Sequence, residues 1–255
     1  MKKSINWRLF RLLLIACIAS SILVLPYILA LSPDLAKLLT PLLLVAQIVQ
    51  AGILFSVAIY VGLLLYPKVG FTLPVLDGTQ PLSHLQTVFK PSVILGVLSG
   101  VFVILSSIPF GSLSLSLMKA EMQVPLWKAF LASLYGGIAE EVLFRLFLMT
   151  TFVWVSTKIK MTSKGQPTSI SIWVVIIVSS LLFGLGHLGI TSSLTAITPT
   201  IVFRAVLLNS VSIVFGWLYW KKGLESAMIA HFTADIVIHV ITPLVARIFM
   251  QFVAF

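Results

Sequence analysis

Two adjacent glutamates, two histidines and an aspartate lie inside strongly apolar segments of this 255-residue sequence. A charged side chain near the centre of a bilayer costs about 2.5–3.5 kcal/mol or more, so ionisable residues in such segments are candidates for function. Only seven residues of the chain are acidic. Three of them, Glu140, Glu141 and Asp235, fall in the apolar segments. They are therefore the first residues to explain.

Glu140 and Glu141 occur in the run Glu140-Glu141-Val142-Leu143-Phe144-Arg145. On a helix, Glu141 and Arg145 are separated by four positions and share a face, so they can neutralise each other. Glu140 points in another direction and has no local partner. Such a carboxylate suits a general base or acid. A purely structural network of the three residues is the alternative, but it would leave the second carboxylate without a counter-charge.

The histidines extend this set of candidates. His187 lies near the end of one apolar segment, and His231 and Asp235 are four positions apart in another. His239 continues that face and is expected to be either a supporting residue or an interfacial one. Arg204 lies in a separate segment, where we favour snorkelling toward the headgroups over binding of a substrate carboxylate.

The elements that must position these residues are membrane helices. Apolar residues make up 59% of the chain and charged residues 9%, far from the roughly 25% charged share of soluble domains. Seven apolar runs of spanning length are predicted, and a short apolar tail could form an eighth span. They are 12–31, 38–66, 92–111, 127–156, 171–190, 198–220 and 224–242. The fold class is thus an all-α, polytopic transmembrane helical bundle with its catalytic site inside.

The basic residues indicate topology rather than nucleic-acid binding, although the net charge is +10. With the N-terminus in the cytoplasm, eleven Lys and Arg residues fall on the inner side and four on the outer side. The sequence therefore predicts a multi-pass integral membrane protein with a cytoplasmic N-terminus. We divide its single membrane domain into N-terminal helices with an interfacial loop (1–126), a catalytic core (127–242) and an apolar tail (243–255).

Several known site patterns are absent. Leu188 follows His187 and Phe232 follows His231, so there is no zincin His-Glu-x-x-His motif. No rhomboid-like serine motif and no presenilin-like aspartyl motif occurs in a span. The Gly-rich run from Gly184 to Gly189 ends an apolar segment and has no strand beside it, which excludes a dinucleotide fingerprint.

Taken in order, Glu140-Glu141-x-x-x-Arg145, Phe183-x-x-x-His187 and His231-x-x-x-Asp235 resemble the motif set of the CPBP family, the CAAX-protease and bacteriocin-processing membrane proteins. The resemblance covers roughly residues 127–240 and implies a membrane endopeptidase. It implies that Glu140, His187, His231 and Asp235 are catalytic and that Glu141 and Arg145 support them. Its substrates would be membrane proteins or lipid-modified peptides. The branch that cleaves prenylated proteins carries asparagine where this chain has Asp235, which weakens an assignment to prenyl processing.

Two mechanisms follow from these residue types. In the favoured one, which needs no cofactor, Glu140 with His187 deprotonates a water molecule and His231 helps to stabilise the oxyanion. Asp235, if ionised, cannot donate a hydrogen bond to that oxyanion, so it must orient His231, carry a proton or bind metal. In the alternative, His187 and His231 with Glu140 or Asp235 bind zinc.

Two further functions remain as alternatives. One is a transporter or channel that uses these residues for protons or cations, and the other is an inactive family member that acts by binding alone. One geometric conflict also remains. Counted from their cytoplasmic flanks, straight helices would separate His187 and His231 in depth by roughly 10 Å.

Overall fold

Helices are the main regular structure in the part of the chain that the computed structural model describes, residues 5–253. Within these residues the only β-type pairing is an isolated bridge between Met161 and Pro167. The predicted all-α class is therefore confirmed. The N-terminal half comprises α1 (Trp7–Leu23), α2 (Leu25–Leu31), α3 (Pro33–Leu38), α4 (Pro41–Leu65), η1 (Tyr66–Lys68), α5 (His84–Ser107), η2 (Ile108–Phe110) and α6 (Gly111–Gln123).

The C-terminal half contains the candidate residues. It comprises α7 (Leu126–Tyr135), η3 (Gly136–Glu140), η4 (Val142–Met149), α8 (Thr150–Ser156), α9 (Ser169–Gly186), α10 (Leu188–Thr191), α11 (Pro199–Asn209), α12 (Ser212–Lys222), α13 (Leu224–Asp235), η5 (Ile236–Ile241) and α14 (Thr242–Val253). The elements from α7 to α8 form one uninterrupted helical run, and so do those from α13 to α14.

Each of the seven predicted spans corresponds to a long helix. Six helices in the described part of the chain are long and apolar enough to cross a membrane: 7–31, 41–68, 84–123, 169–191, 199–222 and 224–252. The seventh is the run from α7 to α8, which carries Glu140, Glu141 and Arg145. The apolar tail does not form an eighth span, because it continues the last helix as α14.

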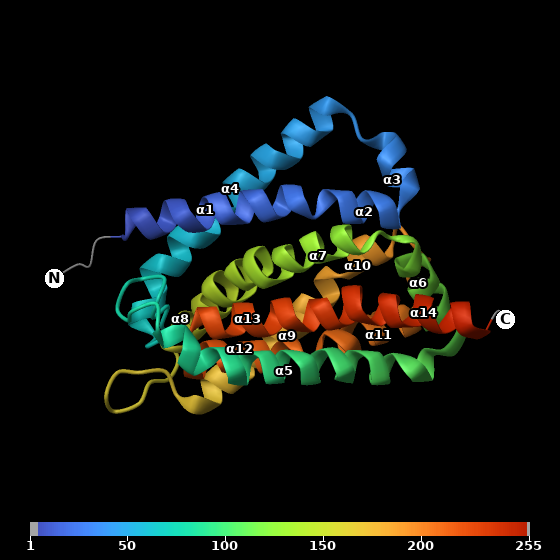
Figure 1. The fold of residues 1–255 in the computed structure, drawn as a ribbon. Coiled ribbons are helices and arrows are strands. Elements are labelled where there is room, and N and C mark those ends of the chain that lie inside the picture. The colour runs from blue at the N-terminus through green and yellow to red at the C-terminus, as the bar shows by residue number, and fades with distance from the viewer. Residues whose placement is uncertain (1–4, 254–255) are drawn as a thin grey trace.

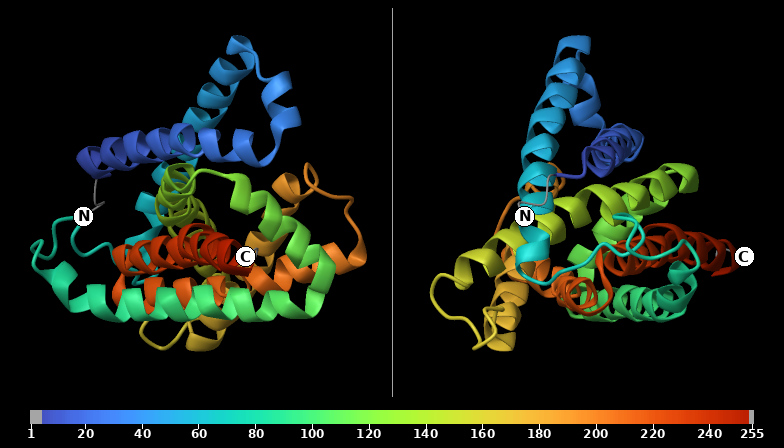
Figure 2. Two further views of the ribbon diagram at one scale, coloured as in Figure 1. Left: turned by 45° about the vertical axis from the view of Figure 1, so that its right-hand side comes forward. Right: turned by 90° about the vertical axis from the view of Figure 1, so that its left-hand side faces the viewer.

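The long helices cross the molecule side by side (Figure 1). In this view α1, α13 and α5 lie nearly parallel, and the N-terminus and C-terminus lie at opposite ends of the bundle. The hairpin from α1 to α4 projects from one side of the remaining helices (Figure 2). The candidate residues thus belong to a compact group of helices that the N-terminal hairpin covers on one side.

Close approach of α5 to α13 depends on two glycines. A Cβ atom at Gly96 would collide with the backbone oxygen of Ala230, and one at Gly100 would lie 2.7 Å from the Cβ of Val237. The four-residue spacing of Gly96 and Gly100 puts both on one face of α5. Small residues let membrane helices come close enough for extensive van der Waals contact. This contact fixes the helix that carries His231 and Asp235.

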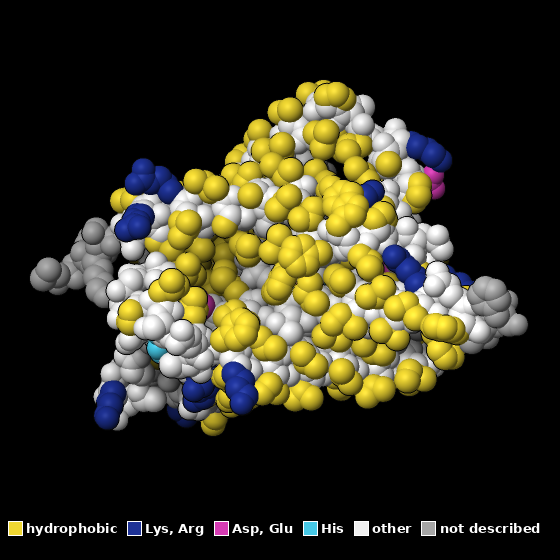
Figure 3. Space-filling model, viewed as in Figure 1, with side chains coloured by type: hydrophobic (Ala, Val, Ile, Leu, Met, Phe, Trp, Pro, Cys, Tyr) yellow, Lys and Arg dark blue, Asp and Glu magenta, His cyan; other side chains and the backbone are white. Residues whose placement is uncertain are grey.

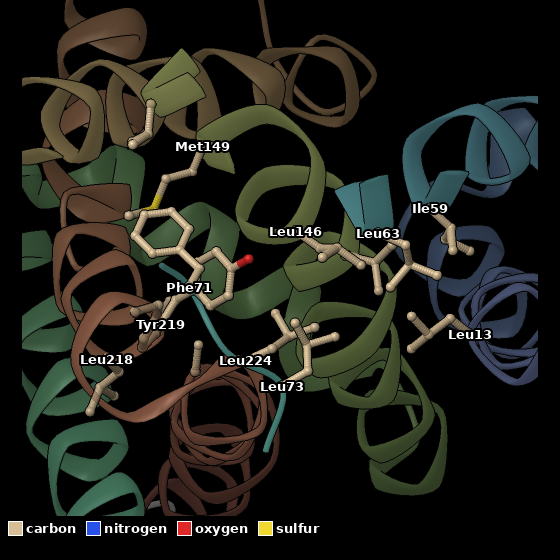
Figure 4. Close-up of a cluster of buried hydrophobic side chains, with 14 of the residues drawn as sticks. Leu13, Ile59, Leu63, Phe71, Leu73, Leu146, Met149, Leu218, Tyr219 and Leu224 are labelled. Carbon is tan, nitrogen blue, oxygen red and sulfur yellow. The ribbon is translucent and has the colours of Figure 1, made fainter. Parts of the chain in front are cut away.

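A buried cluster joins the N-terminal hairpin to the catalytic helices (Figure 4). Leu63 of α4 packs beside Leu146 of η4, and Phe71 lies 4.7 Å from Tyr219 of α12 between ring centroids. Phe71 belongs to the connection 69–83. The first part of this connection is buried in the bundle, since Phe71 is only 2% exposed.

Basic side chains gather at the two ends of the bundle, and hydrophobic side chains cover the surface between them (Figure 3). This distribution matches a bilayer crossed by the long helices. The connection that contains Ser163 lies at the same end of the bundle as the N-terminus. Ser192 follows α10, which lies toward the opposite end (Figure 1).

We expect Ser163→Cys and Ser192→Cys to be labelled by a membrane-impermeant thiol reagent from opposite sides, with Ser163→Cys accessible from the cytoplasm. Both serines are exposed, whereas the native Cys17 is buried and should give no background. Labelling in intact cells and in inverted vesicles measures this. Labelling of both positions from one side would contradict the topology.

Candidate active site

The helix that carries the glutamates departs from α-helical geometry at this point. Glu140 ends one π-helical segment, η3, and Glu141 directly precedes another, η4. π-Helical turns are rare and frequently occur at functional sites, because the extra residue per turn redirects the side chains around it. The two neighbouring carboxylates point to different surroundings, as the sequence predicted.

Glu141 is fully buried and joins two partners. Its Oε2 lies 3.4 Å from Nε of Arg145, and its Oε1 accepts a 2.8 Å hydrogen bond from Nδ1 of His231. The structure therefore brings together the predicted pair of Glu141 and Arg145 and adds His231 to it. Because a carboxylate accepts the Nδ1 proton, the Nε2 atom of His231 is left to act in the site.

Arg145 is also fully buried and fixes further elements. Its terminal nitrogen donates to the backbone oxygen of Ser212 at 3.1 Å and to its hydroxyl at 2.9 Å. The guanidinium carbon lies 5.4 Å from the ring centroid of Phe183 and 5.7 Å from that of Phe215. Cation–π contacts of this kind are favourable where water is excluded. Through Arg145, the start of α12 and the end of α9 are held next to Glu141.

His231 is held in place by two aromatic rings. Phe215 stacks on the imidazole at 4.7 Å with an interplanar angle of 18°, and Phe183 meets it edge-on at 5.5 Å. Its Nε2 lies 3.6 Å from Oε2 of Glu140 and 3.7 Å from Oδ1 of Asp235. These separations exceed a normal hydrogen bond, but the three groups are close enough to bond the same water molecule.

Asp235 fits beside His231 because the facing helix has no side chain there. A Cβ atom at Gly136 of η3 would collide with Oδ2 of Asp235 and lie 3.2 Å from Nε2 of His231. This requirement for glycine was not predicted. No motif in the sequence marks Gly136, since its role depends on a helix about 95 positions further along the chain.

His187 reaches the same site from the end of α9. Its Nδ1 donates to the backbone oxygen of Phe183 at 2.9 Å, which leaves a lone pair on Nε2. Its ring centroid lies 4.7 Å from that of Phe183, whose ring also contacts His231. His187 and His231 are thus separated by a single aromatic side chain.

The expected 10 Å difference in depth does not keep the two histidines apart, because both imidazoles contact the ring of Phe183. The start of α13 is enclosed by the protein. Leu224 is 0% exposed, and its backbone N–H donates to the carbonyl oxygen of Thr72 at 3.1 Å. Glu225 accepts hydrogen bonds of 2.9 and 2.8 Å from the N–H groups of Val75 and Leu76. The connection 69–83 thus covers the turn between α12 and α13.

A cavity of about 390 Å³ contains the predicted catalytic side chains. Glu140, His187, His231 and Asp235 lie on its wall, with apolar residues such as Leu208 around them. Residues of α2, α6 and α10 also line it, so it extends toward the end of the bundle opposite the N-terminus (Figure 1).

A second polar cluster lines this cavity beyond Asp235. His239 of η5 lies 3.4 Å from Oε1 of Glu121, and the hydroxyl of Tyr27 is 3.2 Å from Nδ1 of His239. The sequence indicated His239 as a supporting or interfacial residue, but it gave no sign of Glu121 or Tyr27. Their helices are distant in the sequence, and only the fold brings them together.

The zinc alternative would draw its ligands from His187, His231 and Glu140 or Asp235. Among residues 5–253, no group of three or more His, Cys, Asp or Glu side chains has the spacing of a metal centre.

We expect Arg145→Ala to lower the free energy of unfolding by about 3–5 kcal/mol, because it leaves Glu141 buried without its counter-charge. The double variant Glu141→Gln/Arg145→Gln should regain part of this loss, since it removes both charges. Thermal melts in detergent measure both effects, with the exposed Arg8→Ala as control. If Arg145→Ala melts like the parent protein, the pair does not stabilise the fold.

Comparison with protein families matches residues 122–237 to the type II CAAX prenyl endopeptidase Rce1-like family. Searches of curated proteins and of solved structures gave no match. The matched region starts just before α7 and ends in η5, so it includes both glutamates, Arg145 and the site residues from His187 to Asp235. The match to the Rce1-like family of type II CAAX prenyl endopeptidases thus lies on the helical core of this integral membrane protein, and it supports the resemblance to CAAX proteases that the sequence motifs predicted.

Proposed function

We propose that the protein is an intramembrane endopeptidase in which Glu140 activates water to hydrolyse peptide bonds of membrane-associated substrates. The observation that carries this proposal is the division of labour between the two glutamates. Glu141 is fully buried and bound to Arg145 and His231, whereas the side chain of Glu140 is 20% exposed and lines the cavity. Only Glu140 is free to receive a proton from a water molecule in the cavity.

The reaction would proceed in two steps. Glu140 takes a proton from water as the oxygen attacks the carbonyl carbon of the scissile bond, which gives a tetrahedral oxyanion. The protonated Glu140 then gives the proton to the departing nitrogen as the C–N bond breaks, which releases an amine and a carboxylic acid. His187 assists the first step through the lone pair on Nε2, because its Nδ1 proton is held by Phe183.

His231 would stabilise the oxyanion through Nε2. Donation requires a proton on this atom, and the carboxyl groups of Glu140, Glu141 and Asp235 all lie next to the ring. Asp235 orients this ring, since an ionised carboxylate cannot itself donate to the oxyanion. Phe215 and Phe183 hold the ring in one plane, so that little reorganisation is needed when charge develops.

The substrate in this proposal is a membrane protein or a lipid-modified peptide. The cavity lies among helices whose outer surfaces are apolar, and its wall is mainly apolar apart from the polar groups described above. A polypeptide held at the membrane can reach it without crossing bulk water. Asp235 stands where the prenyl-processing branch carries asparagine, so prenylation of the substrate is not part of the proposal.

We expect Glu140→Gln to abolish peptide cleavage while the protein stays folded. The change preserves side-chain shape and removes the proton acceptor, and Glu140 forms no ion pair on which folding depends other than its loose approach to His231. Mass spectrometry of new peptide termini in membranes that contain the parent or the variant measures this, with Asp34→Asn at an exposed site as control. Equal sets of termini in parent and Glu140→Gln membranes would refute the proposed role.

The zinc alternative gives different results. In the glutamate mechanism we expect purified protein to contain no stoichiometric zinc and chelators to leave cleavage intact. Elemental analysis of the parent, His187→Ala and His231→Ala measures this. If the parent protein holds about one zinc per chain and both histidine variants lose it, the proposed mechanism is wrong, although the peptidase function still stands. The loss is expected for a zinc site because removing one of three ligands makes the ion exchange readily.

A further inference from the structure

Arg204 lines the cavity that also contains Glu140 and His231. It projects from α11, near the end of the bundle opposite the N-terminus (Figure 1). Its Nε donates a 3.4 Å hydrogen bond to the hydroxyl of Ser114, and its guanidinium carbon lies 5.9 Å from the ring centroid of Phe110. These two contacts hold the side chain against α6 and the turn before it. They use only one of its five N–H donors.

Within residues 5–253, no carboxylate lies at ion-pair distance from the guanidinium of Arg204, whereas the fully buried Arg145 has Glu141. The cavity carboxylate of Glu121 is already engaged by His239 and Tyr27. A partly buried cation without a partner is costly in a membrane protein, so its place in this cavity calls for an anionic ligand.

The same cavity wall also carries three carboxylates, those of Glu121, Glu140 and Asp235. An anion would be repelled at each of these carboxylates and attracted at Arg204. A planar guanidinium also matches the two oxygens of a carboxylate in a bidentate fashion.

We propose that Arg204 is a specificity-determining residue that binds a carboxylate of the peptide substrate while Glu140 acts on a bond elsewhere in the same peptide. This inference rests on the proposed peptidase function. Arg204 and Glu140 line the same cavity of about 390 Å³, so one peptide bound in the cavity can contact both, and an extended peptide advances about 3.3 Å per residue. The bound carboxylate therefore belongs to the C-terminus or to an Asp or Glu side chain near the cleaved bond.

Three peptide pools presented to the purified full-length protein in lipid nanodiscs test this. The first pool contains randomised peptides without Asp or Glu and with a free C-terminal carboxylate. The second contains the same peptides as C-terminal amides, and the third contains amides that include Asp and Glu. We expect the first pool to be cleaved at least about tenfold faster than the second, because a charged hydrogen-bonded pair contributes that much discrimination.

The variants identify the residue responsible. Arg204→Gln should reduce cleavage of the first pool to the rate of the second and leave the second unchanged, and Arg204→Lys should retain part of the preference. Lys119→Gln removes a charge from α6 outside the cavity and should change nothing. Faster cleavage of the third pool than of the second, lost in Arg204→Gln, would identify the carboxylate as that of a side chain.

The failures are distinguishable. Equal cleavage of all pools by the parent protein, or an equal loss on all pools in Arg204→Gln, would overturn the role of Arg204 and leave the peptidase function standing. If no pool is cleaved faster by the parent than by Glu140→Gln, the peptidase function fails. Binding of fluorescent acid and amide peptides to Glu140→Gln, with and without Arg204→Gln, then decides the role of Arg204, and equal affinities would overturn it.

Discussion

The site depends on the contacts that the buried carboxylate of Glu141 makes with Arg145 and His231. This carboxylate holds Arg145 on one side and His231 on the other, so that one side chain joins the π-helical segment to α13. Arg145 in turn donates a hydrogen bond to Ser212 and contacts the rings of Phe183 and Phe215, so these residues are also fixed relative to Glu141. Burying such a pair contributes little net stability, but removing one partner leaves an unmatched charge. The arrangement therefore specifies one geometry around His231 and strongly disfavours others.

This geometry explains why two adjacent glutamates serve different purposes. On a helix, neighbouring side chains diverge by about 100°, and the π-helical turns on both sides of Glu141 alter their directions further. One carboxylate is enclosed by the protein and the other faces the cavity. Gly136 completes the site from the same helix by leaving room for Asp235. The short segment from Gly136 to Glu141 thus supplies the reactive carboxylate, the carboxylate that supports the site, and the space that lets α13 approach.

Local and periodic features of the sequence were sufficient to predict much of the structure. Hydropathy located seven long helices, six of which are long and apolar enough to cross a membrane, and the four-residue spacing of Glu141 and Arg145 identified their pair, because both signals depend on neighbours along one helix. Features that depend on distant segments were not predictable. The connection 69–83 is buried over the start of α13, and Glu121 meets His239 only in the folded chain.

The burial of the turn between α12 and α13 has a consequence for the precision of the site. Glu225 binds two backbone N–H groups of the connection 69–83, so this connection fixes where α13 begins. A slip of α13 by one residue would move His231 about 1.5 Å along the helix and turn it by about 100°, away from both glutamates. The connection 69–83 therefore sets the position of α13 along its axis. A displacement of this connection would also displace the imidazole of His231, which lies about two turns further along the helix.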